Sequence, residues 1–415
     1  MQALDIRGAA ALLQPGMTVF IHGMATEPRA LTDYLAANPE HLRGVRLITS
    51  FIPGINTVNL AGLAADSFVV NTMAQRAYAP ARDNGQADWL RLAYSEVPDY
   101  LQALPKIDLA FLHCGRRSNA TLSTGVSGEM LPLAAELAER TCVFINEQMP
   151  IPVRGCDLAT SQVDYAVTHS APLMEYRVDE RGDAASSAIA DYVTSLVDDG
   201  DAIQAGIGVI PSTVFKNLRS RRGLRLYSGM ISDAIADLAD AGALDPSFPH
   251  TYGMALGTQR LFDWLHQREG FSVERVEVAH DRARVQLLDH FVAMNSALEV
   301  ALDGSVNAEQ IGRHVVSGRG GLPDYSTAAS LAEHGRSIIA LPAANLAKGF
   351  SRIVVRLANH DSPTLAVGRA THVITEHGVA AIKGVGPEAV AERLVAVADP
   401  TYRDGLRREW ASLTQ

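Results

Sequence analysis

The sequence predicts an α/β protein with two open, mostly parallel sheets that are covered by helices. Apolar, β-rich runs that end in Gly, Pro or polar residues alternate with helical stretches along almost all of the 415 residues. The segment order helix, turn, strand, Gly-rich loop occurs in "AAALLQPGMTVFIHGMATEP" (9–28) and again in "IADYVTSLVDDGDAIQAGIGVIP" (189–211). With 47% hydrophobic and 20% charged residues, the chain can fill the cores of two or three domains.

The charged, Gly-containing stretch at residues 176–186 precedes the second occurrence of this order. We therefore expect an N-terminal α/β domain at 1–182 and a C-terminal one at 183–415. A helix is expected at 129–141. Strands of the first domain are expected at 17–23, 45–54, 67–73, 107–115 and 142–150. A cleft between two such domains is a preferred ligand site.

Composition argues against several classes of partner. The net charge of −10 disfavours nucleic acid and anionic membranes. No apolar run approaches the roughly 20 residues of a membrane span, and the N-terminus lacks the pattern of a signal peptide. The three cysteines lack CxxC spacing, and "TEHG" (375–378) lacks the HExxH spacing, so no metal is expected. Few, scattered thiols favour a cytoplasmic protein.

Two glycine-rich loops follow predicted strands. In "QAGIGVIP" (204–211), Gly206 and Gly208 precede a helix, so backbone N–H groups can approach an anion. A tight βα turn with packing glycines explains this loop equally well. "VVSGRGGLPDYSTAAS" (315–330) is a second loop of this type, with a helix expected to start at Ser326 or Thr327.

The cations Lys348, Arg352 and Arg356 follow in "SIIALPAANLAKGFSRIVVRL" (337–357). They are available to phosphate groups, although plain surface charge is the alternative. "MNSALEVALDGSVNAEQIG" (294–312) reads as a strand followed by a "DG" hairpin turn.

The stretch "RLYSGMISDA" (225–234) predicts a buried strand that turns into a helix capped by Ser232. In an open α/β sheet, such a turn is where catalytic side chains project. Ser228 and Gly229 stand at its middle, without an acid, a base or a strong nucleophile.

These pieces, in this order, resemble the acetyl-CoA hydrolase/transferase family, of the acetate or 4-hydroxybutyrate CoA-transferase type. The matching stretches are "GIGVIP", "MNSALEVALDGSVNAEQIG", "SGRGGLPDY", "SIIALPAA", "SRIVV" and "VITEHGVAAIKG", with weaker matches in "DLAFLHCG" and "SAPLMEY". The resemblance implies two domains of the NagB/RpiA/CoA-transferase type with acyl-CoA at their junction. It also implies a carboxylate acceptor and a homodimer or larger homo-oligomer.

In this family a glutamate carboxylate attacks the acyl-CoA thioester, and a glutamyl-CoA thioester forms. Backbone N–H donors stabilise the developing oxyanion. By the resemblance, one donor comes from the loop of Gly206, Ile207, Gly208, Val209 and Ile210, near Ile207, and the other from Gly320 or Gly321. Because CoA carries several negative charges, we also expect Lys348, Arg352 or Arg319 to contact its phosphates.

The resemblance breaks at the reaction centre. The nucleophilic glutamate belongs in a T/S-E-M triplet, which here is Ser228-Gly229-Met230. "VAHDR" stands where the family often has "VNDP", which places His280 at an asparagine position. Loss of the glutamate side chain is expected to open space at Gly229. Ser228 is a candidate nucleophile and His280 a candidate base, while turn hydrogen bonding and plain packing are their alternatives.

The resulting hypothesis is an acyl-CoA enzyme that moves or releases CoA without a glutamyl-CoA intermediate. Direct transfer, hydrolysis, and carbon–carbon bond chemistry through a thioester enolate all remain open. A non-catalytic CoA-binding protein is the second hypothesis. A sugar-phosphate enzyme of the wider fold superfamily is the third, and it requires the motifs from 294 to 384 to be coincidental.

Overall fold

The computed structural model describes residues 1–52, 54–74, 76–177, 182–204, 206–312, 314–358 and 360–413. Residues 178–181, within the expected domain boundary, therefore lie outside the described residues. The chain divides into two compact units. The first unit comprises Met1–Arg177, Thr251–Ala279 and Val316–Gly320; the second comprises Val178–His250, His280–Val315 and Gly321–Gln415. The domain limits at 182 and 183 stay a prediction.

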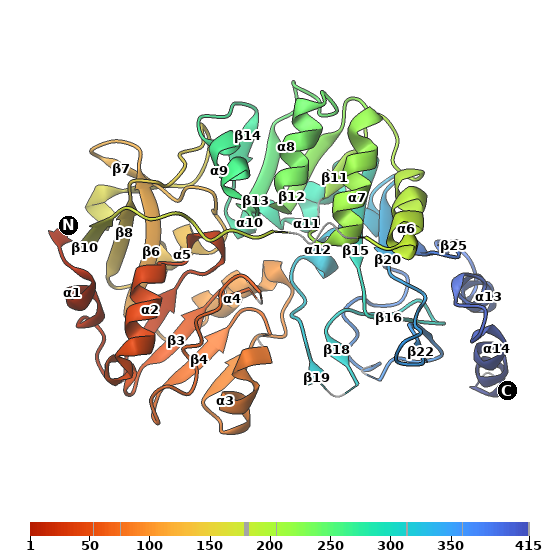
Figure 1. The fold of residues 1–415 in the computed structure, drawn as a ribbon, viewed down its shortest axis with the longest axis horizontal. Helices are drawn as coiled ribbons and strands as arrows, with labels where there is room; N and C mark the ends of the chain where they lie inside the picture. Colours follow the sequence, from red (N-terminus) through yellow and green to blue (C-terminus); the bar gives the residue numbers. More distant parts are fainter. Residues whose placement is uncertain are drawn as a thin grey trace. The chain divides into compact units, whose positions relative to one another are not determined.

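The first unit is built on a parallel sheet, as the alternation of segments predicted (Figure 1). Val19 of its central strand pairs with Leu47 on one side and Leu109 on the other. The strand order is β1 (Gln2–Ala3), β10 (Tyr165–His169), β8 (Thr141–Asn146), β6 (Leu109–Arg116), β2 (Thr18–Ile21), β3 (Arg46–Thr49), β4 (Phe68–Asn71) and β5 (Ala87–Trp89).

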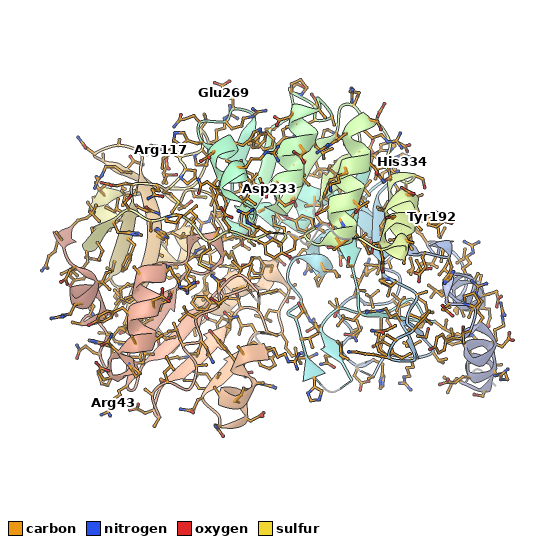
Figure 2. The ribbon with its side chains drawn as sticks, viewed as in Figure 1. Arg43, Arg117, Tyr192, Asp233, Glu269 and His334 are labelled. Carbon is orange, nitrogen blue, oxygen red and sulfur yellow. The ribbon has the colours of Figure 1, made fainter. Side chains whose placement is uncertain are left out.

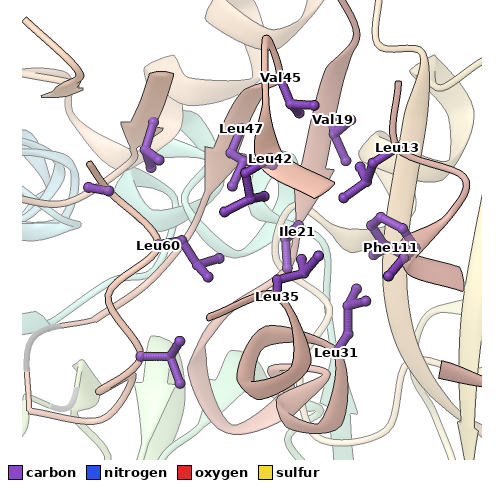
Figure 3. Close-up of a cluster of buried hydrophobic side chains, with 14 of the residues drawn as sticks. Leu13, Val19, Ile21, Leu31, Leu35, Leu42, Val45, Leu47, Leu60 and Phe111 are labelled. Atoms are coloured by element: carbon purple, nitrogen blue, oxygen red, sulfur yellow. The ribbon is translucent and has the colours of Figure 1, made fainter. Parts of the chain in front are cut away.

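Helix α2 (Arg29–Ala37) covers one face of this sheet and helps to close its core (Figure 3). Leu31 and Leu35 are four residues apart, so they project from one face of the helix onto the sheet. Each fully buried side chain of this size contributes about 2 kcal/mol. The other elements of the unit are α1 (Ile6–Ala10), α3 (Ala79–Asp83), α4 (Val97–Gln102), β7 (Thr121–Ser123), α5 (Leu131–Leu137), β9 (Asp157–Ala159), β13 (His250–Ala255, from its second residue), α9 (Gln259–Leu265), β14 (Phe271–Val273) and α10 (Val276–Ala279).

Six strands of a second, eight-stranded sheet belong to the second unit (Figure 1). Five of these six run parallel, and the sixth pairs antiparallel with the fifth. The order is β12 (Arg225–Ile231), β11 (Ala202–Gln204), β15 (Phe291–Ser296), β20 (Arg336–Ala340), β24 (His372–Thr375) and β25 (Gly378–Ala381). The helices of this unit are α6 (Ala184–Thr194), α7 (Val209–Asn217), α8 (Asp233–Asp240), α11 (Arg282–Gln286), α12 (Leu322–Leu331), α13 (Pro387–Val397) and α14 (Arg403–Leu413). The fold class predicted from the sequence is confirmed.

The predicted "DG" turn joins β16 (Glu299–Ala301) to β17 (Val306–Asn307) in an antiparallel pair. The remaining short strands are β18 (Gln310–Ile311), β19 (His314–Val315), β21 (Ala344–Asn345), β22 (Phe350–Ser351) and β23 (Ile353–Val354).

Two expected element boundaries were wrong. Helix α12 begins at Leu322 rather than at Ser326 or Thr327. Pro323 fits the first helical turn because its φ is already helical and its missing N–H has no role there. Strand β12 continues to Ile231, so Gly229 is a strand residue rather than the middle of a turn. Among the residues described, no helix has the length and apolarity to cross a membrane.

Candidate active site

Gly229, near the carboxyl end of β12, lies against the imidazole of His280. A Cβ atom at position 229 would stand 2.5 Å from Nε2 and 2.6 Å from Cε1 of that ring. Real Cβ atoms essentially never come within 3.0 Å of another heavy atom. The expected open space at Gly229 is therefore wrong, because the imidazole fills it.

Gly321, which caps the start of α12, contacts the same imidazole. A Cβ at position 321 would lie 2.6 Å from Cε1 and 2.9 Å from Nδ1 of His280. The φ of Gly321 is −84°, so close approach rather than an unusual backbone conformation calls for glycine here. Two glycine backbones thus contact the ring, and neither position leaves room for a side chain.

The carboxylate of Asp324 contacts the other ring nitrogen of His280. Its Oδ2 lies 3.3 Å from Nδ1, and the Asp324 side chain is only 1% exposed. Its Oδ1 accepts from Nε of Arg282 at 2.9 Å and lies 2.8 Å from Nη2. This ion pair compensates the buried charge of Asp324. A carboxylate beside Nδ1 favours the tautomer with a proton on Nδ1, which leaves Nε2, the atom that faces Gly229, as an acceptor.

Tyr325 also contacts the His280 imidazole and faces Gly229. Its ring centroid lies 5.1 Å from that of His280, and its hydroxyl would lie 3.2 Å from a Cβ at position 229. The ring also stacks with Phe291 of β15, with centroids 6.3 Å apart. A phenol and an imidazole therefore face the same glycine. We call Gly229, His280, Gly321, Asp324 and Tyr325 the His280 cluster.

Sequence reasoning named three members of the His280 cluster and missed Asp324 and Tyr325. Both residues stand in "GLPDYS", directly after the glycine loop, but 44 positions separate Asp324 from His280. No spacing rule joins residues so far apart. The early start of α12 is what brings the two side chains to the imidazole.

Ser228 has a local partner. Its hydroxyl donates to the carbonyl of Met230 at 2.7 Å, and the residue is fully buried. This bond holds the backbone at the end of β12, which agrees with the alternative role of Ser228 in local hydrogen bonding. Its role as a nucleophile stays a prediction.

The loop of Gly206 to Ile210 follows β11, the strand next to β12. Gly208 has a φ of +121°, a conformation that L side chains rarely adopt, and it precedes α7. The amide of Asn295 donates to Gln204 at 3.1 Å and to Ser326 at 3.4 Å. These bonds connect the carboxyl ends of β11 and β15 to α12. A small apolar pocket beside the loop is lined by Val193, Ile210, Pro211, Val214, Phe215, Met294, Asn295, Ser296 and Ala340.

The remaining predicted groups have these places. Lys348 is exposed in the turn between β21 and β22, whereas Arg352 is half-buried and donates to the carbonyl of Leu298 at 3.3 Å. Gly320 belongs to the first unit, where its carbonyl accepts from the N–H of Tyr94 at 2.9 Å. The predicted contacts of these groups with CoA stay a prediction.

Comparison with known proteins supplies the family. Residues 4–175 match the acetyl-CoA hydrolase/transferase N-terminal domain, and residues 257–410 match the C-terminal domain of the same family. The chain belongs to the acetyl-CoA hydrolase/transferase family. It is 28% identical to the 4-hydroxybutyrate coenzyme A transferase of Clostridium kluyveri, over 94% of this chain and 93% of that one. It is 27% identical to the butyryl-CoA:acetate CoA-transferase of Anaerostipes caccae, over 92% and 90%.

Two solved structures share the fold of this acetyl-CoA hydrolase/transferase family member. RipA from Yersinia pestis aligns with a TM-score of 0.86 and 22% identity, covering 100% of this chain and 97% of that one. The 4-hydroxybutyrate CoA-transferase of Porphyromonas gingivalis aligns with a TM-score of 0.81 and 22% identity, over 98% and 97%. An enzyme of the CoA-transferase and acyl-CoA hydrolase class, with CoA thioesters as its class of substrate, follows from the family.

Proposed function

We propose that this enzyme releases CoA from an acyl-CoA thioester without a glutamyl-CoA intermediate, with His280 as the general base. One observation carries the proposal: the imidazole fills the space into which a side chain at position 229 would project. The family resemblance puts the nucleophilic glutamate at that position. An imidazole therefore lies where this family is expected to have its covalent nucleophile, and we assign it the role of the base.

Hydrolysis is the reaction that a base at this place serves best. A carboxylate attacks a thioester unaided, whereas water needs a partner that accepts its proton. His280 would take a proton through Nε2 as water attacks the thioester carbonyl, and Asp324 would stabilise the imidazolium. The tetrahedral intermediate would then expel the CoA thiolate, which recovers the proton from the imidazolium. The products are a carboxylic acid and CoA.

The glycine loops would supply the electrostatic part of this reaction. Backbone N–H groups of the loop from Gly206 to Ile210, near Ile207, and of Gly320 or Gly321 would donate to the developing oxyanion. Lys348 and Arg352 would contact the phosphates of CoA. Support for the first loop comes from its place after β11, beside the strand that carries Gly229.

A second candidate is a non-catalytic CoA-binding protein. The burial of His280, which is 3% exposed, favours it, because a ring packed between two glycines also serves as a simple space filler. Both candidates predict CoA binding. Only the first predicts turnover that depends on the imidazole.

The decisive experiment measures free thiol and acyl exchange together on a panel of short acyl-CoA substrates, with and without acetate. We expect thiol release that needs no acceptor. His280→Gln keeps a polar side chain but removes the base, and it should lower turnover by 10²- to 10⁴-fold, about the range that general bases contribute. Its affinity for CoA should remain close to that of the wild type.

Ser228→Ala is the matched control at the same strand end. Because the Ser228 hydroxyl has a backbone partner, we expect this variant to keep most of the thiol release. Loss of activity in Ser228→Ala, with His280→Gln active, would assign the reaction to the hydroxyl instead. Exchange that requires acetate would show transfer rather than hydrolysis. CoA binding without turnover on any substrate of the panel would favour the non-catalytic candidate.

A further inference from the structure

A second group of potential ligands lies at the opposite edge of the sheet in the second unit. Asp289 and His290 directly precede β15, and His334 stands two residues before β20. One ligand atom from each of the three lies within 4.8 Å of the other two. The amino ends of parallel strands meet at the edge that faces away from their carboxyl ends, so this group is separate from the His280 cluster.

The sheet itself fixes the spacing of the two histidines. β15 and β20 are parallel neighbours, and Val292 pairs with Arg336. Extended back by two residues, this register places His290 beside His334. The two imidazole rings stack, with centroids 4.7 Å apart and an interplanar angle of 12°. This separation matches the spacing of adjacent strands, so two rigid elements present the pair.

Both histidines also have the same unusual backbone. His290 and His334 each have a φ of +56°, which glycine adopts without steric cost. Non-glycine residues in this region cost about 1 kcal/mol or more and are enriched at functional positions. Two neighbouring turns therefore carry histidine at positions where glycine would have the lower conformational free energy.

The existing contacts leave the side chains able to rearrange. His334 Nδ1 lies 3.3 Å from one Asp289 oxygen, and His290 Nε2 lies 3.5 Å from the other. Both distances exceed those of strong charge-assisted hydrogen bonds. The side chains of Asp289 and His334 are each 59% exposed, and that of His290 is 47% exposed. His334, labelled in Figure 2, is exposed enough for a dissolved ion to reach it.

We infer that Asp289, His290 and His334 form a binding site for a divalent transition-metal ion, of which Zn²⁺ is the best match. Two imidazoles and one carboxylate are ligands that Zn²⁺ prefers, and three protein ligands leave a fourth position for water. Bonds of about 2.0 Å place ligand atoms about 3.3 Å apart in a tetrahedron, so the two rings must rotate out of their stacked arrangement to close the site. The bound ion joins the amino ends of β15 and β20.

Two charges next to His290 offset each other. The guanidinium of Arg336 lies 2.8 Å from the buried carboxylate of Asp201, and His290 Nδ1 lies 4.0 Å from the same carboxylate. The Asp201 carboxylate therefore offsets the repulsion that Arg336 would exert on a metal ion.

The test uses the full chain without a histidine tag, stripped with a chelator and titrated with Zn²⁺ against a chromophoric zinc indicator. We expect one Zn²⁺ per chain at this site and a rise in the melting temperature on binding. His334→Ala should weaken the affinity by at least about tenfold, since even outer-shell changes cost that much. His290→Ala combined with His334→Ala should abolish both effects.

His314→Ala is the control, because His314 is also an exposed histidine of this unit but lies outside the group. It should bind Zn²⁺ as the wild type does. Co²⁺ in place of Zn²⁺ should give the visible absorption of a tetrahedral site in the wild type and in His314→Ala. The variant that lacks both His290 and His334 should not show this absorption. Wild-type binding weaker than about 1 mM, or binding retained by the double variant, would overturn the inference.

Discussion

Substitution of Gly229 by alanine tests whether the His280 imidazole occupies the space above that residue. The added Cβ would stand 2.5 Å from Nε2, which is 0.5 Å inside the limit that real Cβ atoms respect. The ring has little room to retreat, because Gly321 contacts it and Asp324 holds Nδ1. Overpacking of this kind costs about 1–3 kcal/mol. In a unit of roughly 200 residues, 1 kcal/mol lowers the melting temperature by about 2–4 °C, so we expect a loss of about 2–12 °C.

A double-mutant cycle isolates the contact. Gly229→Ala, His280→Ala and the double variant are compared by thermal and urea unfolding. Removal of the imidazole makes room for the new methyl group, so the double variant should be more stable than the two single losses predict, by at least about 1 kcal/mol. Gly405→Ala in α14 is the control, since a Cβ there meets no atom within 4 Å, so stability should stay the same or rise by up to about 1 kcal/mol. A fully stable Gly229→Ala variant, or strictly additive losses in the cycle, would refute the placement of the ring.

Three further predictions concern both units. Gly321→Ala should destabilise the second unit by about 1–3 kcal/mol in the same unfolding assays, because its Cβ would lie 2.6 Å from the same imidazole; an unchanged melting temperature would contradict this. Joint reversal of Lys348 and Arg352 to glutamate should weaken CoA binding at least about tenfold in calorimetry, and unchanged affinity would remove both from the proposed phosphate contacts. Burial lowers the pKa of His22 and of His113 to about 3, so between pH 6.5 and 3 the unfolded chain binds protons that the folded chain does not. Stability should therefore fall as pH falls through this window, by up to about 1.4 kcal/mol per pH unit for each histidine, and urea unfolding of His113→Gln should show a shallower dependence than the wild type.

The sequence by itself determined the fold class, because strand and helix periodicity and glycine punctuation are local signals. It predicted strands such as β2, β6 and β12 and the "DG" hairpin of β16 and β17. It also determined the family, since several ordered motifs matched at once. The two glycines against His280 stood in quoted motifs, so the sequence named both positions, although not their contact with the imidazole.

Only the tertiary structure decided which groups contact those positions. The sequence implied an empty space at Gly229, whereas the fold fills it with an imidazole from a segment 51 residues later. Asp324 and the pair of His290 and His334 escaped notice for the same reason: their partners are 44 residues away along the chain. Local patterns carry information over one helical turn or one hairpin, but contacts between loops depend on strand order and register. These contacts exist only once the sheet has assembled.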